Sequence, residues 1–456
     1  AHFRIISINA DVFFFTPHNM LRILRPTVSS KIHFYRLYST ATANGSNIIK
    51  KEPLSPLGKH LHDSIKVTGP LTVSHFMRQV LVNPLSGYYM LGDVFGTQGD
   101  FVTSPEISQV FGEASLCGVW YLTEWMRLGQ PQKTQIIEFG PGRGTLMSDM
   151  LRTLSQFPQF YKTLTDVHFI EASPGLRKMQ RAALVIGSEE RDVIRVEGNK
   201  DEAPIETITR EDGVKVSWHD GIEVVPDQWS FIMAHEFFDA LPIHSFEKTD
   251  KEWRELMVDM DDTDESEHNF RIVKSPNQAA MTATLLSDKK FESYKDGDRV
   301  DISPDCWGIM DKIAKYLDKN GGTGLAIDYG QDYVQGDTLR AIKDHKIIHP
   351  MCDPGTADLS ADVDFSFLKQ AITNGSDITA YGPITQKDFL QSLGIQARIE
   401  NLFRNAKTSA ARKSLLDGAE RLMDPEAMGR IYKVLAFAND KNTEKKNEPV
   451  GFEKHH

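Results

Sequence analysis

Three polar side chains follow an apolar run in the middle of the chain, and their types suit chemistry on a positively charged group. Residues 230–234 carry no charge, as is typical of a central parallel strand buried on both faces, and lead into His235, Glu236 and Asp239. Glu236 could hold a guanidinium through two hydrogen bonds, Asp239 could add a second anchor, and His235 could accept a proton. A structural interpretation stays open, in which Asp239 caps a helix and His235 is a hydrogen-bonded core histidine.

A glycine-rich segment nearer the N-terminus indicates the reaction partner of these residues. An apolar run ends at Glu138, and Gly140, Gly142 and Gly144 then precede a helix-like run over residues 146–154. Glycine permits positive φ and close approach of a ligand to the backbone, and a helix start presents unpaired N–H groups. The succession of strand, glycine loop and helix therefore predicts a site for a nucleotide-like cofactor.

The spacing of the glycines separates the kinds of cofactor loop. A dinucleotide fingerprint needs glycine at its sixth place, which is Thr145 here, and a phosphate-binding loop needs a lysine that this segment lacks. An acid two residues before Gly-x-Gly-x-Gly is instead similar to the first motif of class I S-adenosyl-L-methionine (SAM) methyltransferases. Glu138 would then accept a hydrogen bond near the amino acid end of the cofactor. The alternative is a turn that only closes a strand and helix unit.

The next two strand ends add candidate cofactor residues. Residues 166–170 predict a second buried strand that ends in Glu171, where an acid would face the ribose hydroxyls. The alternative is that this acid belongs to the start of the following helix. A third strand over residues 214–218 precedes Asp220, which is either an adenine contact or an exposed turn residue.

Five segments taken together resemble the MidA-like family. They are residues 100–113, 138–146, 235–242, 327–330 and 382–386. The resemblance covers about residues 68–438 and implies an α/β, Rossmann-like class I SAM-methyltransferase fold, with a mostly parallel sheet and an additional mainly helical lobe. Mitochondrial members of the family are complex I assembly factors that act as SAM-dependent protein arginine methyltransferases. The resemblance thus implies SAM as cofactor and symmetric dimethylation of an arginine on a core matrix-arm subunit of complex I.

The resemblance also implies further site residues. Ser104, Pro105 and Glu106 lie in a family motif, and we expect the first two to contact the cofactor and Glu106 to contact the substrate. Asp328 and Tyr329 follow another apolar run, so they are expected at the carboxyl edge of the sheet, where they would shape the substrate mouth.

An acid-rich segment further along the chain has two interpretations. Its acids, Asp358, Asp362 and Asp364, follow His345 and His349, so a metal site is conceivable. Methyl transfer from SAM needs no metal, and the spacing matches none of the common ligand patterns. We therefore predict no metal and favour an acidic groove for a basic peptide.

Composition limits the class of protein. The chain has 456 residues, 40% of them hydrophobic, which suits an enzyme of more than one lobe. A net charge of −11 argues against a nucleic acid partner and favours a basic substrate. The cysteines, Cys117, Cys306 and Cys352, are spaced neither for a disulfide framework nor for structural zinc, so we expect reduced thiols.

The first 38 residues predict a mitochondrial transit peptide and hence a matrix location. They hold five basic residues and one acid, and Arg36, Leu37 and Tyr38 before Ser39 resemble a matrix-processing site. Their surplus of four positive charges means that removal would leave a net charge of −15. A terminal tail without an address is the alternative, and no apolar run predicts a membrane span.

The rest of the chain divides into predicted regions by pattern and composition. They are a linker (39–67), a helical and loop segment contributing to the cleft (68–133), the methyltransferase core with an acidic hairpin near 250–275 (134–335), a substrate-side region (336–438) and a disordered tail (439–456). Protein arginine methylation is the favoured function, with a protein as substrate and a homodimer left open. A small-molecule methyltransferase and a non-catalytic, SAM-binding assembly chaperone are the alternatives.

Overall fold

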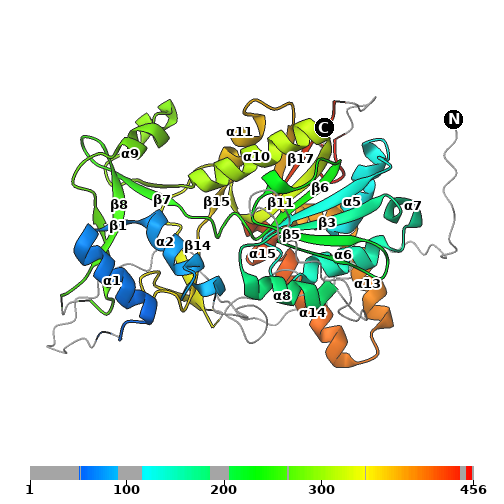
Figure 1. Ribbon diagram of the computed structural model, residues 1–456, viewed down its shortest axis with the longest axis horizontal. Coiled ribbons are helices and arrows are strands. Elements are labelled where there is room, and N and C mark those ends of the chain that lie inside the picture. Colours follow the sequence, from blue (N-terminus) through cyan, green and yellow to red (C-terminus); the bar gives the residue numbers. More distant parts are fainter. Residues whose placement is uncertain are drawn as a thin grey trace, which may run out of the picture. The chain divides into compact units, whose positions relative to one another are not determined.

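A nine-stranded sheet forms the centre of the protein in the computed structural model (Figure 1). The structure describes residues 51, 53–90, 116–184, 205–263, 266–344, 346–441 and 448–453. The order of the strands is β16-β17-β11-β6-β2-β3-β5-β4, and β15 pairs with β11. Their bounds are β2 (Thr134–Phe139), β3 (Leu164–Ile170), β4 (Glu206–Thr209), β5 (Lys215–His219), β6 (Ser230–His235), β11 (Gly322–Gln331), β15 (Val363–Asp364), β16 (Thr379–Thr385) and β17 (Tyr432–Ala438).

The middle of this sheet is parallel and its edges are antiparallel. Strands β5, β3, β2, β6 and β11 pair in parallel, whereas β4, β17 and β16 pair antiparallel to their neighbours. Carboxyl ends of parallel strands meet at one edge, so the residues that follow β2, β3 and β6 are brought together there. The predicted α/β fold with a mostly parallel sheet is confirmed.

Helices cover both faces of the sheet, and the strands alternate between the two resulting cores. Within β6, Phe231 and Met233 join one core while Ile232 and Ala234 join the other. The first core includes residues of α5 (Leu116–Arg127), α6 (Thr145–Leu154), α7 (Pro158–Tyr161), α8 (Pro174–Leu184), α12 (Gln386–Ser392), α13 (Ile395–Asn405), α14 (Ser409–Met423) and α15 (Met428–Ile431). The second includes residues of α10 (Pro304–Asn320), α11 (Phe365–Thr373) and the short helix η2 (Ile222–Val224).

Two smaller antiparallel sheets belong to the additional lobe, which therefore contains strands as well as helices. One joins β1 (Leu71–Thr72), β7 (His244–Lys248), β8 (Trp253–Met260), β9 (Phe270–Lys274) and β10 (Arg299–Ile302). The other joins β12 (Arg340–Lys343), β13 (Lys346–Ile348) and β14 (Asp358–Ser360). The hairpin expected near residues 250–275 corresponds to β8 and β9, and neighbours distant in sequence extend it into a sheet.

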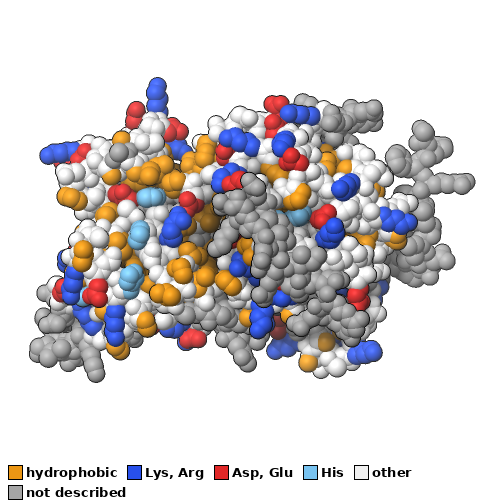
Figure 2. Space-filling model, in the orientation of Figure 1, with side chains coloured by type: hydrophobic (Ala, Val, Ile, Leu, Met, Phe, Trp, Pro, Cys, Tyr) orange, Lys and Arg blue, Asp and Glu red, His pale blue; other side chains and the backbone are white. Residues whose placement is uncertain are grey.

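Further helices accompany these sheets. They are α1 (Pro56–Thr68), α2 (Val73–Val82), α9 (Ala280–Leu285), η1 (Tyr88–Met90) and η3 (Lys289–Ser293). Figure 2 shows charged side chains of both signs dispersed over the molecule, with apolar side chains gathered over the region of α2. Val82, the last residue of α2, is 42% exposed, and Leu85 is 89% exposed. In the part of the chain that the structure describes, every helix is too short or too polar to cross a bilayer.

Helix α1 corrects the predicted linker over residues 39–67. Ser55 caps the helix, because its hydroxyl accepts the N–H of Gly58 at 2.9 Å, and Pro56 occupies the first turn. The buried face of the helix consists of Leu57, Leu61 and Ile65. A proline that resembled a linker residue is thus a helix start.

The predicted end of the core at residue 335 is also wrong. Strands β16 and β17 follow much later in the chain, yet β17 pairs with β11 from Thr323–Ala438 through Tyr329–Tyr432 and completes the sheet. The region from residue 336 onward therefore contributes strands both to the central sheet and to the additional lobe.

Part of the predicted disordered tail, residues 439–456, packs against the core. Phe452 is 7% exposed, and its ring centroid lies 6.0 Å from that of Phe389. The indole N–H of Trp120 donates to the carbonyl oxygen of Val450 at 3.2 Å. One aromatic residue thus anchors a segment whose polar composition predicted disorder. The predicted transit peptide and the segment with Ser104, Pro105 and Glu106 lie outside the described residues.

Candidate active site

A cavity of about 290 Å³ lies where β2, β3 and β6 end. The structure brings seven of the predicted site residues together in its lining: Glu138, Gly140, Gly142, Glu171, His235, Glu236 and Asp239. Residues 81–82 and 89–90 line it from the α2 side. Among the other predicted residues that are described, Gly144, Asp220, Asp328 and Tyr329 do not line it.

The glycine loop has the geometry that its sequence predicts. Gly140 has φ +59°, and a Cβ atom built there would lie 2.8 Å from a ring carbon of Phe237, so a larger residue would clash. Gly144 has φ +80° and is the N-cap of α6. Gly144 packs closely against α8, because a Cβ atom built there would lie 3.2 Å from the Cα of Gln180.

Glu138 has a buried carboxyl oxygen to which a bound ligand could donate a hydrogen bond. The residue is 2% exposed and lines the cavity, and its Oε2 has no hydrogen-bonding partner among the described residues. Burial raises the pKa of this carboxyl to about 8. A cationic ligand group beside Glu138 would supply the hydrogen bond and favour the ionised form.

Glu171 contacts the start of the following helix, as one of its two interpretations predicts, and its contact with a ribose stays a prediction. Its Oε1 accepts the backbone N–H of Ser173 at 2.8 Å at the start of the following helix, yet the side chain also lines the cavity. Its Oε2 accepts the amide N–H of Gln180 at 3.0 Å. Burial raises the pKa of Glu171 above its ordinary value. Each carboxylate oxygen keeps a second lone pair for a ligand hydroxyl.

Gln180 on α8 joins the glycine loop to this acid. Its amide nitrogen also donates to the carbonyl oxygen of Gly142 at 2.7 Å, and its amide oxygen accepts the indole N–H of Trp218 at 2.8 Å. The sequence alone did not single out Gln180, because its value depends on contacts with three separate segments.

Asp328 holds the loop after β6 in place, which corrects its predicted role at the substrate mouth. It is fully buried, and its Oδ2 accepts the backbone N–H groups of Phe237, Phe238 and Asp239 at 3.2, 2.9 and 3.2 Å. Burial, together with the charges of Asp239 and Glu236, raises the pKa of Asp328 well above its ordinary value. Asp328 lies at the predicted edge of the sheet, but its side chain faces the backbone of the loop after β6 and does not line the cavity.

Tyr329 likewise lies behind the cavity, so its predicted substrate contact is corrected. The Arg340 guanidinium lies over its ring, 4.9 Å from the centroid, and forms an ion pair with Asp362. Burial raises the pKa of Asp239, whereas neighbouring Tyr329 and Arg340 lower it. Tyr329 is therefore a neighbour of both Asp239 and the partly buried Arg340 guanidinium.

His235 and Glu236 differ in what they can do chemically. Burial lowers the pKa of His235 to about 3, so the imidazole is neutral near pH 7 and a weak proton acceptor. The low pKa favours a hydrogen-bonding role, and the predicted role of His235 as a base stays a prediction. Glu236 has φ +50°, an unusual conformation for a residue other than glycine, as is common where a side chain is held for function.

Three titratable lining residues were not assigned to the cavity from the sequence. Arg143 lies within the glycine loop, Tyr89 comes from η1, and Asp358 comes from β14. The Tyr89 hydroxyl donates to Asp358 Oδ1 at 2.8 Å, and Asp358 is 7% exposed. Asp358 belonged to the predicted acidic groove, but only the fold places it beside Asp239.

Carboxyl groups outnumber basic groups in the lining of the cavity. Five carboxyl residues line it, namely Glu138, Glu171, Glu236, Asp239 and Asp358, against Arg143 as the only arginine or lysine among the described lining residues. Asp220, by contrast, is exposed and stays only a prediction as an adenine contact. Across the described ranges, His, Cys, Asp and Glu side chains form no group that could hold a metal ion.

The sheet order, the glycine loop after β2 and the acid after β3 define a class I methyltransferase fold with a cofactor cavity. A family model of S-adenosyl-L-methionine-dependent methyltransferases matches residues 116–384, and the chain belongs to this family. The protein is thus a SAM-dependent enzyme. The buried unpaired oxygen of Glu138 and the open backbone at Gly142 fit this cofactor.

Relatives with known names agree with this assignment. The chain is 38% identical over 388 residues to human "Protein arginine methyltransferase NDUFAF7, mitochondrial", covering 85% of this chain and 84% of the human one. The protein of the same name from Xenopus tropicalis is 39% identical, with 87% and 89% covered.

A solved structure shows the same fold. It is a COG1565 superfamily member from Burkholderia thailandensis bound to S-adenosylhomocysteine. The TM-score is 0.66 at 22% identity, over 89% of this chain and 96% of that one.

Proposed function

We propose that this protein is a SAM-dependent protein arginine N-methyltransferase of mitochondria. The observation that carries the proposal is the convergence of Glu236, Asp239 and Asp358 in one cavity with the glycine loop. Carboxylates at this density suit a guanidinium acceptor, and the relatives named above are arginine methyltransferases. The matrix location, symmetric dimethylation and a core matrix-arm subunit of complex I as substrate rest on the MidA-like resemblance. No part of the proposal depends on a homodimer.

The residues that would hold SAM lie on the β2 and β3 side of the cavity. Glu138 would accept from the α-ammonium, Arg143 would pair with the α-carboxylate, and Glu171 would accept from the ribose hydroxyls. When bound there, SAM supplies a methyl group on a positively charged sulfur. The remaining requirements, which are orientation of the acceptor nitrogen and removal of its proton, fall to the chain itself.

Glu236 and Asp239 would orient the acceptor and take its proton. A carboxylate that accepts two N–H groups fixes the plane of a guanidinium and leaves one nitrogen directed at the methyl group. Burial raises the pKa of Asp239, so its carboxylate is a stronger base than an exposed aspartate. Neutral His235 would donate or accept a hydrogen bond at the cavity wall without changing its charge.

A labelling experiment tests the proposal. Mitochondrial extract lacking the protein is incubated with methyl-labelled SAM and either the wild type or Glu236→Gln. The control is Glu400→Gln, an exposed residue on α13. We expect the wild type and the control to label arginine on one polypeptide, and Glu236→Gln to bind SAM normally without labelling it.

Two other results would overturn the proposal in different ways. Label confined to small molecules would indicate a small-molecule methyltransferase. Cofactor binding without transfer to any acceptor by the wild type would indicate the non-catalytic assembly chaperone. Retained labelling by Glu236→Gln would refute the role of Glu236.

A further inference from the structure

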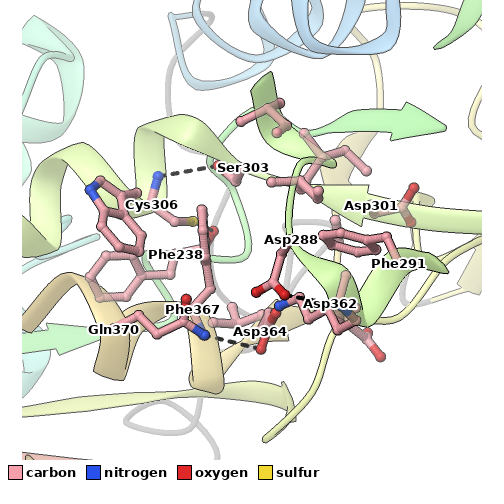
Figure 3. A pocket seen from close by; sticks show the side chains of 18 of the residues that line it. Phe238, Asp288, Phe291, Asp301, Ser303, Cys306, Asp362, Asp364, Phe367 and Gln370 are labelled. Carbon is pink, nitrogen blue, oxygen red and sulfur yellow. Dashed lines mark hydrogen bonds between the residues drawn. The ribbon is translucent and has the colours of Figure 1, made fainter. Parts of the chain in front are cut away.

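A second cavity, of about 200 Å³, lies on the other side of the loop that follows β6 (Figure 3). Phe238 lines this second cavity, whereas its neighbours Phe237 and Asp239 line the first. A single stretch of backbone, held by Asp328, therefore separates the two. The segment that begins with β14 borders both, since Asp358 in β14 lines the first cavity and Asp362 after it lines the second.

The walls of the second cavity combine aromatic rings with carboxylates. Its rings are those of Phe238, Phe291, Trp307 and Phe367, and its acids are Asp288, Asp301, Asp362 and Asp364. In the view of Figure 3, Asp288 and Asp364 lie between Phe238 and Phe291. Aromatic faces and carboxylates both attract cations, so the lining favours a positively charged side chain over a neutral or anionic one.

The acids differ in how far they are already neutralised. Asp362 is paired with Arg340, and Asp301 accepts the N–H and hydroxyl of Thr338, each at 2.8 Å. Asp288 and Asp364 instead accept N–H groups at helix starts, and neither has an ion-pair partner among the described residues. These two carboxylates are therefore available to an incoming cation.

A cation of the chain itself already lies against this wall. The Lys290 ammonium is 5.0 Å from the centroid of the Phe291 ring. Burial raises the pKa of Asp364, and the charge of Lys290 partly opposes this rise. Lys290 is exposed at the cavity rim, so it can move aside without disturbing the core. Its position shows that the wall accommodates an ammonium group.

We propose that the second cavity binds an arginine or lysine side chain of the same polypeptide whose acceptor arginine enters the first cavity. This inference rests on the proposed function, because it places both cavities on one substrate. Because adjacent residues of one loop line the two cavities, Phe238 the second and Phe237 and Asp239 the first, the two bound basic residues would lie only a few positions apart in an extended chain. The second cavity would thus select acceptor arginines that have a basic neighbour.

Binding to the second cavity can be measured without any methyl transfer. The protein is labelled with 5-fluorotryptophan, and the ¹⁹F signal of Trp307, one of six tryptophans, is assigned with Trp307→Phe. N-acetyl-arginine amide is titrated against its neutral isostere, N-acetyl-citrulline amide. We expect a saturable shift of the Trp307 signal with arginine and none with citrulline.

Charge variants locate the effect. Asp288→Asn with Asp364→Asn removes two charges but keeps both helix caps, since asparagine caps as well as aspartate, and should weaken arginine binding about tenfold. Lys290→Met should strengthen it by several fold. The control Asp388→Asn with Asp424→Asn removes two charges on and after other helices, at residues that line neither cavity, and should change nothing.

The inference fails if citrulline shifts the signal equally, if the cavity double variant binds arginine as the wild type does, or if the control weakens binding as much. Peptides then test the link to turnover, with lysine or citrulline at successive offsets from the acceptor arginine. At one offset the cavity double variant should raise KM about tenfold for the lysine peptide alone and leave kcat unchanged. Equal KM changes for both peptides would contradict the inference. Because the fluorine titration needs no turnover, its result stands even if no peptide is methylated.

Discussion

The two sides of the active-site cavity are built differently. The cofactor side comes from consecutive strand ends, with Glu138 near the end of β2, the glycines after β2 and Glu171 after β3. The acceptor side joins Tyr89, Glu236 and Asp358, which lie far apart in the chain. A binding motif can therefore be local, whereas the groups that select an acceptor depend on how distant segments pack.

The two sides also differ in what holds them. The cofactor side relies on backbone conformation at Gly140 and on the amide of Gln180. The acceptor side relies on a buried carboxylate, Asp328, which is close to Asp239 and Glu236. Damage to the first should affect cofactor affinity, and damage to the second should affect folding and turnover.

The largest expected effect follows Asp328→Asn. An amide group replaces a buried carboxylate that accepts three backbone N–H groups, so we expect a loss of about 3 kcal/mol in the free energy of unfolding. Denaturant unfolding measures this loss. Asp332→Asn is the control, since Asp332 is exposed and forms an ion pair with Lys369 at the surface, where a change of at most about 1 kcal/mol is expected. Equal losses for both variants would remove the distinction between the two sides.

Gly140→Ala should weaken cofactor binding and leave the acceptor side intact. Positive φ costs a residue with a side chain about 1 kcal/mol, and contact with the Phe237 ring adds to this, so SAM affinity should fall about 100-fold in calorimetry. Gly213→Ala is the matched control, because Gly213 has φ +86° and open space around it. Unchanged affinity in Gly140→Ala would show that the loop does not contact the cofactor.

Cofactor affinity should depend on pH through Glu138. Its pKa near 8 means that the carboxyl is mostly protonated at pH 7, and a ligand ammonium needs the carboxylate. Affinity should therefore rise about tenfold per pH unit from pH 6 toward 8 and then level off. Glu138→Gln should abolish this slope, and a slope that persists in the variant would assign it to another group.

The same group affects stability in the opposite direction. Because the folded-state pKa is raised from an ordinary 4.5 to about 8, protonated Glu138 stabilises the cofactor-free fold. That contribution is fully present below about pH 4.5 and is lost as the pH rises through about 8. Thermal unfolding of Glu138→Gln should lack this part of the pH dependence.

Tyr89→Phe should have the smallest effect, and it tests whether Tyr89 belongs to the acceptor side of the cavity. It removes the hydrogen bond to Asp358, worth about 1 kcal/mol, so KM for the acceptor should rise about fivefold while SAM affinity stays constant. Tyr333→Phe, at a tyrosine that is 60% exposed, serves as the control. A change in SAM affinity without a change in KM would place Tyr89 on the cofactor side.

The sequence predicted the fold and the cofactor side because both are encoded in short segments. Apolar strands followed by Glu138, the glycines and Glu171 specify a parallel sheet with a binding edge. The sequence could not give the direction of a buried side chain, so Asp328 and Tyr329 were predicted at the substrate mouth although they point inward.

Packing between distant segments accounts for the remaining differences. Nothing near Asp358 indicates that β14 lies beside the loop after β6, where the backbone N–H of Ala361 donates to the carbonyl oxygen of Asp239 at 2.9 Å. Composition near Pro56 and Phe452 suggested a linker and a tail, because local polarity does not reveal which few apolar residues find a core.

The most direct test is a crystal structure of the protein with S-adenosylhomocysteine and an arginine peptide. We predict that the cofactor contacts Gly140, Gly142 and Glu171, and that the peptide guanidinium hydrogen-bonds to Glu236 within the same cavity. A guanidinium bound elsewhere, or a cofactor away from the glycine loop, would contradict the division of this cavity into a cofactor side and an acceptor side.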